Sequence, residues 1–339
     1  MSLRSTITLA RWLGPWADAT KQPQVAITDD ALDGMRVRVY RPHRRARGTF
    51  LIAPGLHYAG ADDPRLDRFC RILAASGQVV VAPFIPDYLA LVPSERAKAD
   101  FARAFDALPR WSDHARPVVF SISFGSLLAF ALAAERGDAI ERLVIFGGYA
   151  DLRETLQFCL TGSIASGRQA ARDPLNQPVV LMNLLHLLDC ADREAVVTGW
   201  RAYVERTWGR PEMKARERFV AVAEELAPSV PAAVRELFLV GIGVTPGADK
   251  LALAALERFD GRALDPTPYL PHVTIPVELV HGIDDDVIPY EHAHALGRQL
   301  PNARVHLTGL YGHTGTSKLA LSAIARELAT MVRVLRVLS

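Results

Sequence analysis

The sequence of 339 residues predicts an α/β protein with a mostly parallel central sheet of about eight strands, flanked by helices and interrupted by an inserted all-helical cap. Short apolar runs alternate with amphipathic helical stretches up to residue 151, a pattern typical of a parallel sheet covered on both faces. The alternation stops over residues 152–267, where the pattern is helical, and strand-like runs resume after residue 268. Half of the residues are apolar, which is enough for a sizeable core.

The predicted core begins with two strands that flank the pair Asp33-Gly34, which is a signal for a hairpin turn. Their sequences are QVAITDD and MRVRVYRP, and the second alternates apolar and polar residues. Two buried strands follow, GTFLIAPG (48–55) and QVVVAPFIP (78–86), and the amphipathic helix PRLDRFCRILAASG (64–77) joins them.

The same alternation continues to the end of the core. A helix in ERAKADFARAFDALPRW precedes the strand RPVVFSIS, and a helix in FGSLLAFALAAERG precedes the strand IERLVIFGGYAD. After the helical insertion, the strand-like runs TIPVELVHG and ARVHLTGL are each followed by a helix. We therefore expect an N-terminal helical segment at 1–24, a core formed by 25–151 and 268–339, and a helical cap at 152–267.

Composition excludes several classes of partner. The net charge of +2 indicates neither a nucleic acid nor an anionic membrane. We expect no secretory signal, because the short apolar run near residue 10 contains an arginine, and no integral membrane segment, because no run of about eighteen apolar residues occurs. Three widely spaced cysteines suit reduced core residues of a cytoplasmic protein, and nothing indicates the oligomeric state. These cysteines are Cys70, Cys159 and Cys190.

A serine marks the end of the strand RPVVFSIS. Ser123 stands between the small residues Ser121 and Gly125, and helix-forming sequence follows at once. A serine hydroxyl is a poor nucleophile at neutral pH unless a base lies beside it and an anion-stabilising pocket lies in front of it. A tight strand-to-helix turn exposes such a serine, and small residues two positions before and after it let strand and helix approach closely. The pattern thus predicts a nucleophile at Ser123.

This arrangement resembles the α/β-hydrolase superfamily, in particular esterase- and lipase-like members with a helical cap. The family's G-x-S-x-G elbow has a serine, Ser121, in place of its first glycine here. The resemblance implies an acid and then a histidine later in the chain. The segment VELVHGIDDDVIP places the acid at Asp285, with Asp284 and Asp286 as neighbouring alternatives. Asp151 is a further alternative for the acid, after the strand that follows the elbow.

The resemblance also implies the base and the oxyanion hole. His313, in a Gly-His-Thr-Gly loop after the last strand, would take the Ser123 proton. The backbone N–H groups of Phe124 and Leu56 would bind the oxyanion, and His57 and Tyr58 are expected to line the substrate site.

No metal or cofactor is expected. His281, His292 and His294 lack the spacing of a ligand set, and no nucleotide-binding glycine pattern occurs. We therefore expect a serine hydrolase that cleaves a small, mainly apolar carboxylic ester. Two alternatives remain open: an acyltransferase that uses the same triad, and an inactive binding protein that keeps the hydrolase fold.

Overall fold

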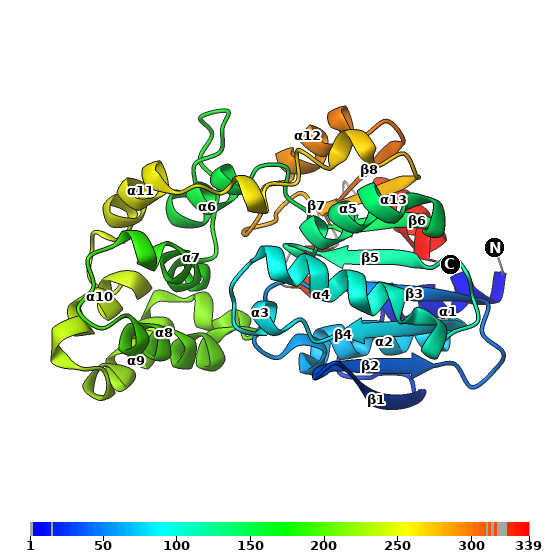
Figure 1. Cartoon of the computed structure of the whole chain (residues 1–339), viewed down its shortest axis with the longest axis horizontal. Helices are drawn as coiled ribbons and strands as arrows, with labels where there is room; N and C mark the ends of the chain where they lie inside the picture. Colours follow the sequence, from blue (N-terminus) through cyan, green and yellow to red (C-terminus); the bar gives the residue numbers. More distant parts are fainter. Residues whose placement is uncertain (1–2, 15, 310, 313–314, 317–323, 339) are drawn as a thin grey trace. The chain divides into compact units, whose positions relative to one another are not determined.

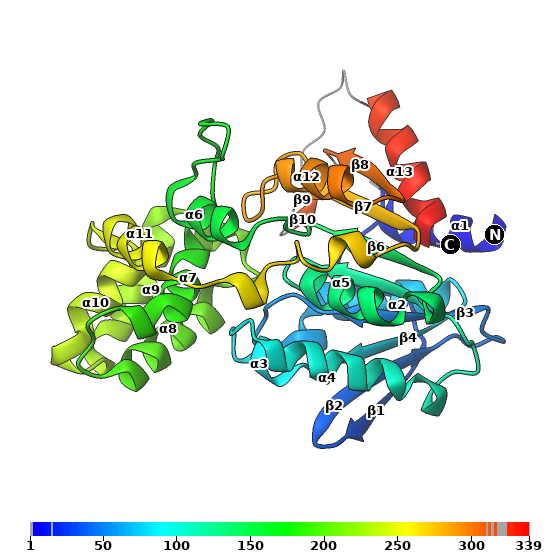
Figure 2. The same cartoon turned by 45° about the horizontal axis from the view of Figure 1, so that its top comes forward.

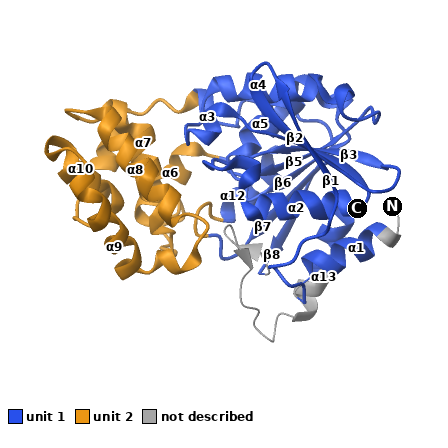
Figure 3. Ribbon diagram, turned by 90° about the horizontal axis from the view of Figure 1, so that it is seen from below, with its two compact units in different colours: residues 1–150, 263–285, 290–339 blue, residues 151–262, 286–289 orange. Residues whose placement is uncertain are grey.

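The computed structural model describes the chain except residues 1–2, 15, 310, 313–314, 317–323 and 339. It divides into two compact units (Figure 3). The first contains residues 1–150, 263–285 and 290–339, and the second contains 151–262 and 286–289. Most of the second unit, residues 151–262, is therefore one insertion in the sequence of the first, and residues 286–289 are a second, short one.

The first unit is built around one sheet of eight strands, which runs from β1 at one edge to β8 at the other (Figures 1 and 2). The spatial order is β1-β2-β4-β3-β5-β6-β7-β8. The pairs β1–β2 and β2–β4 are antiparallel, and every later pair is parallel. This confirms the fold class expected from the sequence. The strands are β1 (Ala26–Leu32), β2 (Met35–Arg41), β3 (Gly48–Ala53), β4 (Gln78–Pro83), β5 (Val118–Ile122), β6 (Arg142–Phe146), β7 (Val277–Gly282) and β8 (Ala303–Thr308).

The predicted hairpin is present between β1 and β2. Asp33 and Gly34 both have positive φ, 50° and 83°, and Leu32 pairs directly with Met35. Positive φ at both central residues is what a two-residue hairpin turn of the favoured hand requires, and Asp-Gly accepts it at low cost. A second, two-stranded sheet pairs β9 (Tyr311–Gly312) with β10 (Gly315–Thr316).

Helices cover both faces of the sheet. Leu9, Leu73 and Leu335, from α1, α2 and α13, join the buried cluster on one face, and Figure 3 shows α4 and α5 on the other. None of the helices in the described ranges is long and apolar enough to cross a membrane. The helices of this unit are α1 (Leu3–Leu13), α2 (Pro64–Ala75), α3 (Pro86–Leu89), α4 (Glu95–Asp106), α5 (Gly125–Arg136), α12 (Glu291–Gln299) and α13 (Ile324–Leu338).

The second unit is helical. Its core holds Trp200 and Phe238, both fully buried, and the Trp200 indole N–H donates to the Phe238 carbonyl at 3.1 Å. Gly241 allows this packing, because a Cβ there would lie 2.3 Å from the indole. Its helices are α6 (Leu152–Thr161), α7 (Gln177–Leu184), α8 (Arg193–Thr207), α9 (Arg216–Leu226), α10 (Ala232–Ile242) and α11 (Ala248–Arg258).

Candidate active site

The residues singled out in the sequence follow parallel strands of one sheet. Leu56 comes after β3, Ser123 directly after β5, and Asp285 after β7. Because these strands are parallel, their carboxyl ends lie along the same edge of the sheet. In open α/β sheets, ligands bind outside this edge.

Ser123 occupies a strained turn between β5 and α5. Its φ is +53°, and its N–H donates to the Phe146 carbonyl on the neighbouring strand at 2.9 Å. Its own carbonyl accepts from the Ser126 N–H at 3.0 Å, which starts the helix. A left-handed conformation costs a residue other than glycine about 1–2 kcal/mol. The surrounding contacts hold Ser123 in this conformation, as expected for a nucleophile elbow.

Two glycines lie where the loop after β3 approaches this turn. A Cβ on Gly125 would lie 2.2 Å from the Ala53 carbonyl oxygen and 2.6 Å from the Pro54 carbonyl oxygen. A Cβ on Gly55 would lie 3.1 Å from the Ile122 oxygen and 3.4 Å from the Ser123 Cβ. The loop after β3 therefore passes directly beside the elbow, which excludes a side chain at position 125 and leaves little room for one at position 55.

Buried aromatic residues hold the residue after the serine. The Tyr88 hydroxyl, on a side chain only 1% exposed, donates to the Phe124 carbonyl at 3.0 Å. The Phe124 ring packs against the Tyr149 ring with a centroid distance of 5.1 Å. The carbonyl and the side chain of Phe124 are thus both fixed. Its N–H shares a peptide plane with the Ser123 carbonyl, which the hydrogen bond from Ser126 holds.

Two backbone N–H groups beside Ser123 are available to a ligand. In the part of the chain that the structure describes, neither the Phe124 N–H nor the Leu56 N–H donates a hydrogen bond. Phe124 precedes the first turn of α5, where N–H groups have no partner within the helix and the helix dipole favours negative charge. These two donors fit the expected oxyanion hole.

Asp285 is the buried carboxylate of the Asp284–Asp286 run. Its Oδ2 lies 3.4 Å from Nε2 of His281, and both side chains are 1% exposed. Asp284 is exposed, and Asp286 pairs with Lys214 in the helical unit. Of the three aspartates, Asp285 alone has the burial expected of a residue that orients a catalytic histidine.

A second buried histidine lies in the same region. His292, on α12, accepts the Ala150 N–H at Nδ1 with a distance of 3.1 Å and is 4% exposed. Burial, and to a smaller extent electrostatic interaction with His281, lower the pKa of His292 to about 4. His292 is therefore neutral at pH 7 and serves as a hydrogen-bond acceptor at the end of β6.

His57 is engaged on both ring nitrogens. Nδ1 accepts the Ala59 N–H at 3.2 Å, and Nε2 lies 3.2 Å from Oδ2 of Asp63. Its ring stacks on Tyr58 with a centroid distance of 4.7 Å. Burial lowers the pKa of His57; the nearby Asp63 charge raises it in part, and Arg65 lowers it. Sequence reasoning assigned His57 and Tyr58 to the substrate site, and it did not identify the contact with Asp63.

Solved structures offer a comparison for this fold. A serine hydrolase from the polyaromatic-hydrocarbon-degrading bacterium Cycloclasticus zankles matches over 92% of this chain and 97% of its own, at 12% identity and a TM-score of 0.49. Proline iminopeptidase from Mycobacterium smegmatis matches over 92% and 97%, at 15% identity and a TM-score of 0.48. Both are enzymes of the α/β-hydrolase fold. No protein-family model and no curated protein matches the sequence.

The strand order of the sheet and a serine at positive φ between β5 and α5 decide which fold this is. The chain has the α/β-hydrolase fold. The resemblance found in the sequence is thus confirmed for the fold. An α/β-hydrolase fold hosts many reactions, so the chemistry of this chain has to be argued from its own site.

Two further residues were expected at the site, the base His313 and the alternative acid Asp151. His313, the expected base of this α/β-hydrolase fold, lies outside the described residues. Asp151, the alternative acid, caps α6 instead: its Oδ1 accepts the Glu154 N–H at 2.8 Å. A carboxylate at a helix N-cap already has a structural role.

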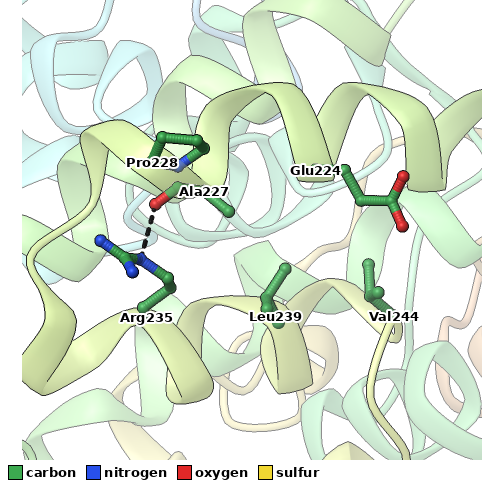
Figure 4. A pocket seen from close by; sticks show the side chains of 6 residues that line it. All are labelled: Glu224, Ala227, Pro228, Arg235, Leu239 and Val244. Atoms are coloured by element: carbon green, nitrogen blue, oxygen red, sulfur yellow. Dashed lines mark hydrogen bonds between the residues drawn. The ribbon is translucent and has the colours of Figure 1, made fainter.

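The helical unit inserted in the α/β-hydrolase fold contains a cavity of its own. It has a volume of about 360 Å³ and lies between α9 and α10 (Figure 4). The Arg235 guanidinium at its wall donates to the Ala227 and Val230 carbonyls. The lining has no nucleophile and no histidine, so we do not assign this cavity to catalysis. It is lined by Glu224, Ala227, Pro228, Arg235, Leu239 and Val244.

Among the residues with a described position, no group of three or more His, Cys, Asp or Glu side chains could hold a metal ion. His281 and His292 instead have Asp285 and Ala150 as protein partners.

Proposed function

We propose that this chain is a serine hydrolase that cleaves carboxylic esters through an acyl-enzyme on Ser123. Asp285 and His313 complete the triad, and the N–H groups of Leu56 and Phe124 form the oxyanion hole. The observation that carries the proposal is the conformation of Ser123: a residue other than glycine at φ +53°, between a buried strand and the start of a helix. Such strain persists where the surrounding structure maintains it, and it concentrates at functional sites.

The reaction follows from these groups. His313 takes the Ser123 hydroxyl proton as Oγ attacks the ester carbonyl carbon, and the carbonyl π electrons move to the oxygen. The resulting oxyanion accepts hydrogen bonds from the two N–H groups. When the tetrahedral intermediate collapses, the C–O bond to the alcohol breaks and His313 returns the proton to the leaving oxygen. Water repeats the sequence on the acyl-enzyme, and Asp285 orients and stabilises the imidazolium throughout.

We also propose a mainly apolar substrate and a cytoplasmic location. Support for the substrate is the abundance of Leu, Val, Phe and Trp in the helical unit, although Trp200, Phe219 and Phe238 are buried in its interior. Support for the location is that Cys70, Cys159 and Cys190 are all free thiols.

Fluorophosphonate labelling tests the nucleophile. We expect intact-mass analysis to show one adduct on the wild-type protein and none on Ser123→Ala. The matched control is Ser126→Ala, which removes a nearby buried hydroxyl that has no hydrogen-bond partner among the described residues. This control should keep the adduct. A folded wild-type protein without an adduct, or an adduct that persists in Ser123→Ala, would contradict the proposal.

A second measurement separates hydrolysis from the alternatives. We expect p-nitrophenyl esters of increasing chain length to be turned over, with the best rates for the more apolar acyl groups. If the p-nitrophenyl ester forms an acyl-enzyme that water does not hydrolyse, and an added alcohol or amine takes up the acyl group, the protein is an acyltransferase. A folded chain with neither adduct nor turnover would favour an inactive binding protein.

A further inference from the structure

The loop after β3 is folded back on itself by His57. The His57 carbonyl accepts the Gly60 N–H at 3.0 Å, and its Nδ1 accepts the Ala59 N–H at 3.2 Å. Gly60 has φ +52°, and a Cβ there would lie 2.9 Å from both Leu89 and Phe84 side chains. One residue thus closes the turn with its backbone and its side chain.

The hydrogen bond from Ala59 indicates the tautomer of His57. A backbone N–H can only donate, so Nδ1 must carry a lone pair, and in the neutral ring the proton is on Nε2. This Nε2 lies 3.2 Å from Oδ2 of the Asp63 carboxylate, and the Arg65 guanidinium nitrogen lies 3.5 Å from the same Nε2. Because burial lowers the pKa of His57, the neutral ring is the form present at pH 7.

Asp63 is itself held firmly. It is 7% exposed and is the N-cap of α2, where its Oδ1 accepts the Arg65 N–H at 2.8 Å. The Arg65 guanidinium binds both carboxylate oxygens, at 3.0 and 2.9 Å. Burial alone would raise the pKa of the Asp63 carboxyl, but the hydrogen bonds and charge of Arg65 outweigh it and lower the pKa. The group that faces Nε2 of His57 is therefore a charged carboxylate at the N-cap of α2.

The loop held in this way carries an expected oxyanion donor. Leu56 directly precedes His57, and Gly55 lies against the Ser123 Cβ. An oxyanion donor lowers the barrier only if its position is maintained before the charge develops. The N-terminal end of the loop is anchored by β3. The His57–Asp63 contact restrains the loop at its C-terminal end, which does not continue into a strand.

We propose that His57 is a positioning residue, whose neutral imidazole braces the loop 55–60 against Asp63 and so holds the Leu56 N–H toward the reacting carbonyl. This inference rests on the proposed function for its catalytic consequence, whereas the brace itself is a property of the loop. It assigns to His57 a role different from direct contact with substrate.

Three variants separate the two nitrogens of His57. The Gln side-chain amide nitrogen in His57→Gln can replace Nε2–H and keep the contact with Asp63. The Asn oxygen in His57→Asn can replace Nδ1 and keep the bond from Ala59. His57→Leu keeps neither. With p-nitrophenyl butyrate we expect His57→Leu to lose about 100-fold in kcat with KM little changed, the loss typical of one oxyanion donor. Restoration of at least part of kcat is expected in His57→Gln, and less in His57→Asn.

The matched control is Asp62→Asn, which changes the adjacent carboxylate. Asp62 pairs with Arg36 and Arg38 on the surface and makes no contact with His57, so we expect unchanged kcat and KM. A rise in KM at constant kcat in His57→Leu would assign His57 to substrate binding and overturn the proposal. Equal kcat in His57→Leu and His57→Gln would show that the contact with Asp63 does not matter.

Amide hydrogen exchange tests the brace without catalysis. We expect peptides covering 55–60 to exchange faster in His57→Leu than in the wild type, and peptides from β5 to be unchanged. Unchanged exchange of the loop would overturn the brace even if the protein is an active esterase. Faster loop exchange in a protein that fluorophosphonate does not label would retain the brace and reject the proposed function.

Discussion

Asp285 and His281 form a buried pair within one strand-and-turn segment. Oδ2 of Asp285 lies 3.4 Å from Nε2 of His281, and the two residues are four positions apart. His281 is on β7, where it pairs with Leu307 of the edge strand β8, so the carboxylate is tied to a strand that has neighbours on both sides. An acid that orients a catalytic imidazole must be held in place itself, and this contact supplies one such restraint.

Asp285→Asn should lower kcat by about four orders of magnitude, because an amide in place of the carboxylate favours the wrong imidazole tautomer and does not stabilise its cation. Asp151→Asn should leave kcat unchanged and the protein as stable as the wild type, since Asn caps a helix about as well as Asp. Steady-state kinetics on one p-nitrophenyl ester, with thermal melts of both variants, checks this. The opposite ranking of the two variants would make Asp151 the acid.

His292 should make the protein less stable in mild acid. The imidazole binds a proton below a pKa of about 6.5 in the unfolded chain, but only below about 4 in the folded protein. Between these values the unfolded state holds more protons, so the free energy of unfolding falls as the pH falls. We expect this residue alone to account for a loss of about 2 kcal/mol between pH 7 and pH 5.

Urea unfolding of wild type and His292→Asn at both pH values measures this contribution. The Asn oxygen can still accept the Ala150 N–H, and the comparison uses only the difference between pH values, so a constant effect of Asn on α12 cancels. We expect the wild type to lose about 2 kcal/mol more than the variant. An equal loss in the two proteins would show that His292 does not titrate as described.

Gly125→Ala should destabilise the protein by about 3 kcal/mol and reduce fluorophosphonate labelling, because its Cβ would meet two backbone carbonyl oxygens that cannot move independently. Gly137→Ala, at the other end of α5, is the matched control. Gly137 has helical angles, and its Cβ would lie 3.6 Å from the Ile275 side chain. This change should stabilise by about 0.5 kcal/mol. Urea unfolding measures the free energy of unfolding of both variants. If Gly125→Ala changes it no more than Gly137→Ala does, the elbow tolerates a side chain.

The sequence predicted the sheet and the elbow because both leave local signals. Buried parallel strands appear as continuous apolar runs, and Asp33-Gly34 specifies a tight hairpin by its backbone preferences alone. The small residues around Ser123 are likewise readable, since the close approach of Gly125 to Ala53 excludes a side chain. The sequence contains only a weak signal for the proximity of His281 to Asp285: the two residues are four positions apart across the end of a strand. We did not use this signal in the sequence analysis.

By itself, the sequence determined the α/β fold class, the serine at the turn and the order in which candidate catalytic residues occur along the chain. The tertiary structure decided which carboxylate is buried, that His57 contacts Asp63, and that Tyr88 holds the Phe124 carbonyl. Strand and turn preferences act between neighbouring residues and are therefore visible in the sequence. Burial and side-chain pairing depend on which surfaces the folded chain brings together, and these determine protonation and orientation at the site.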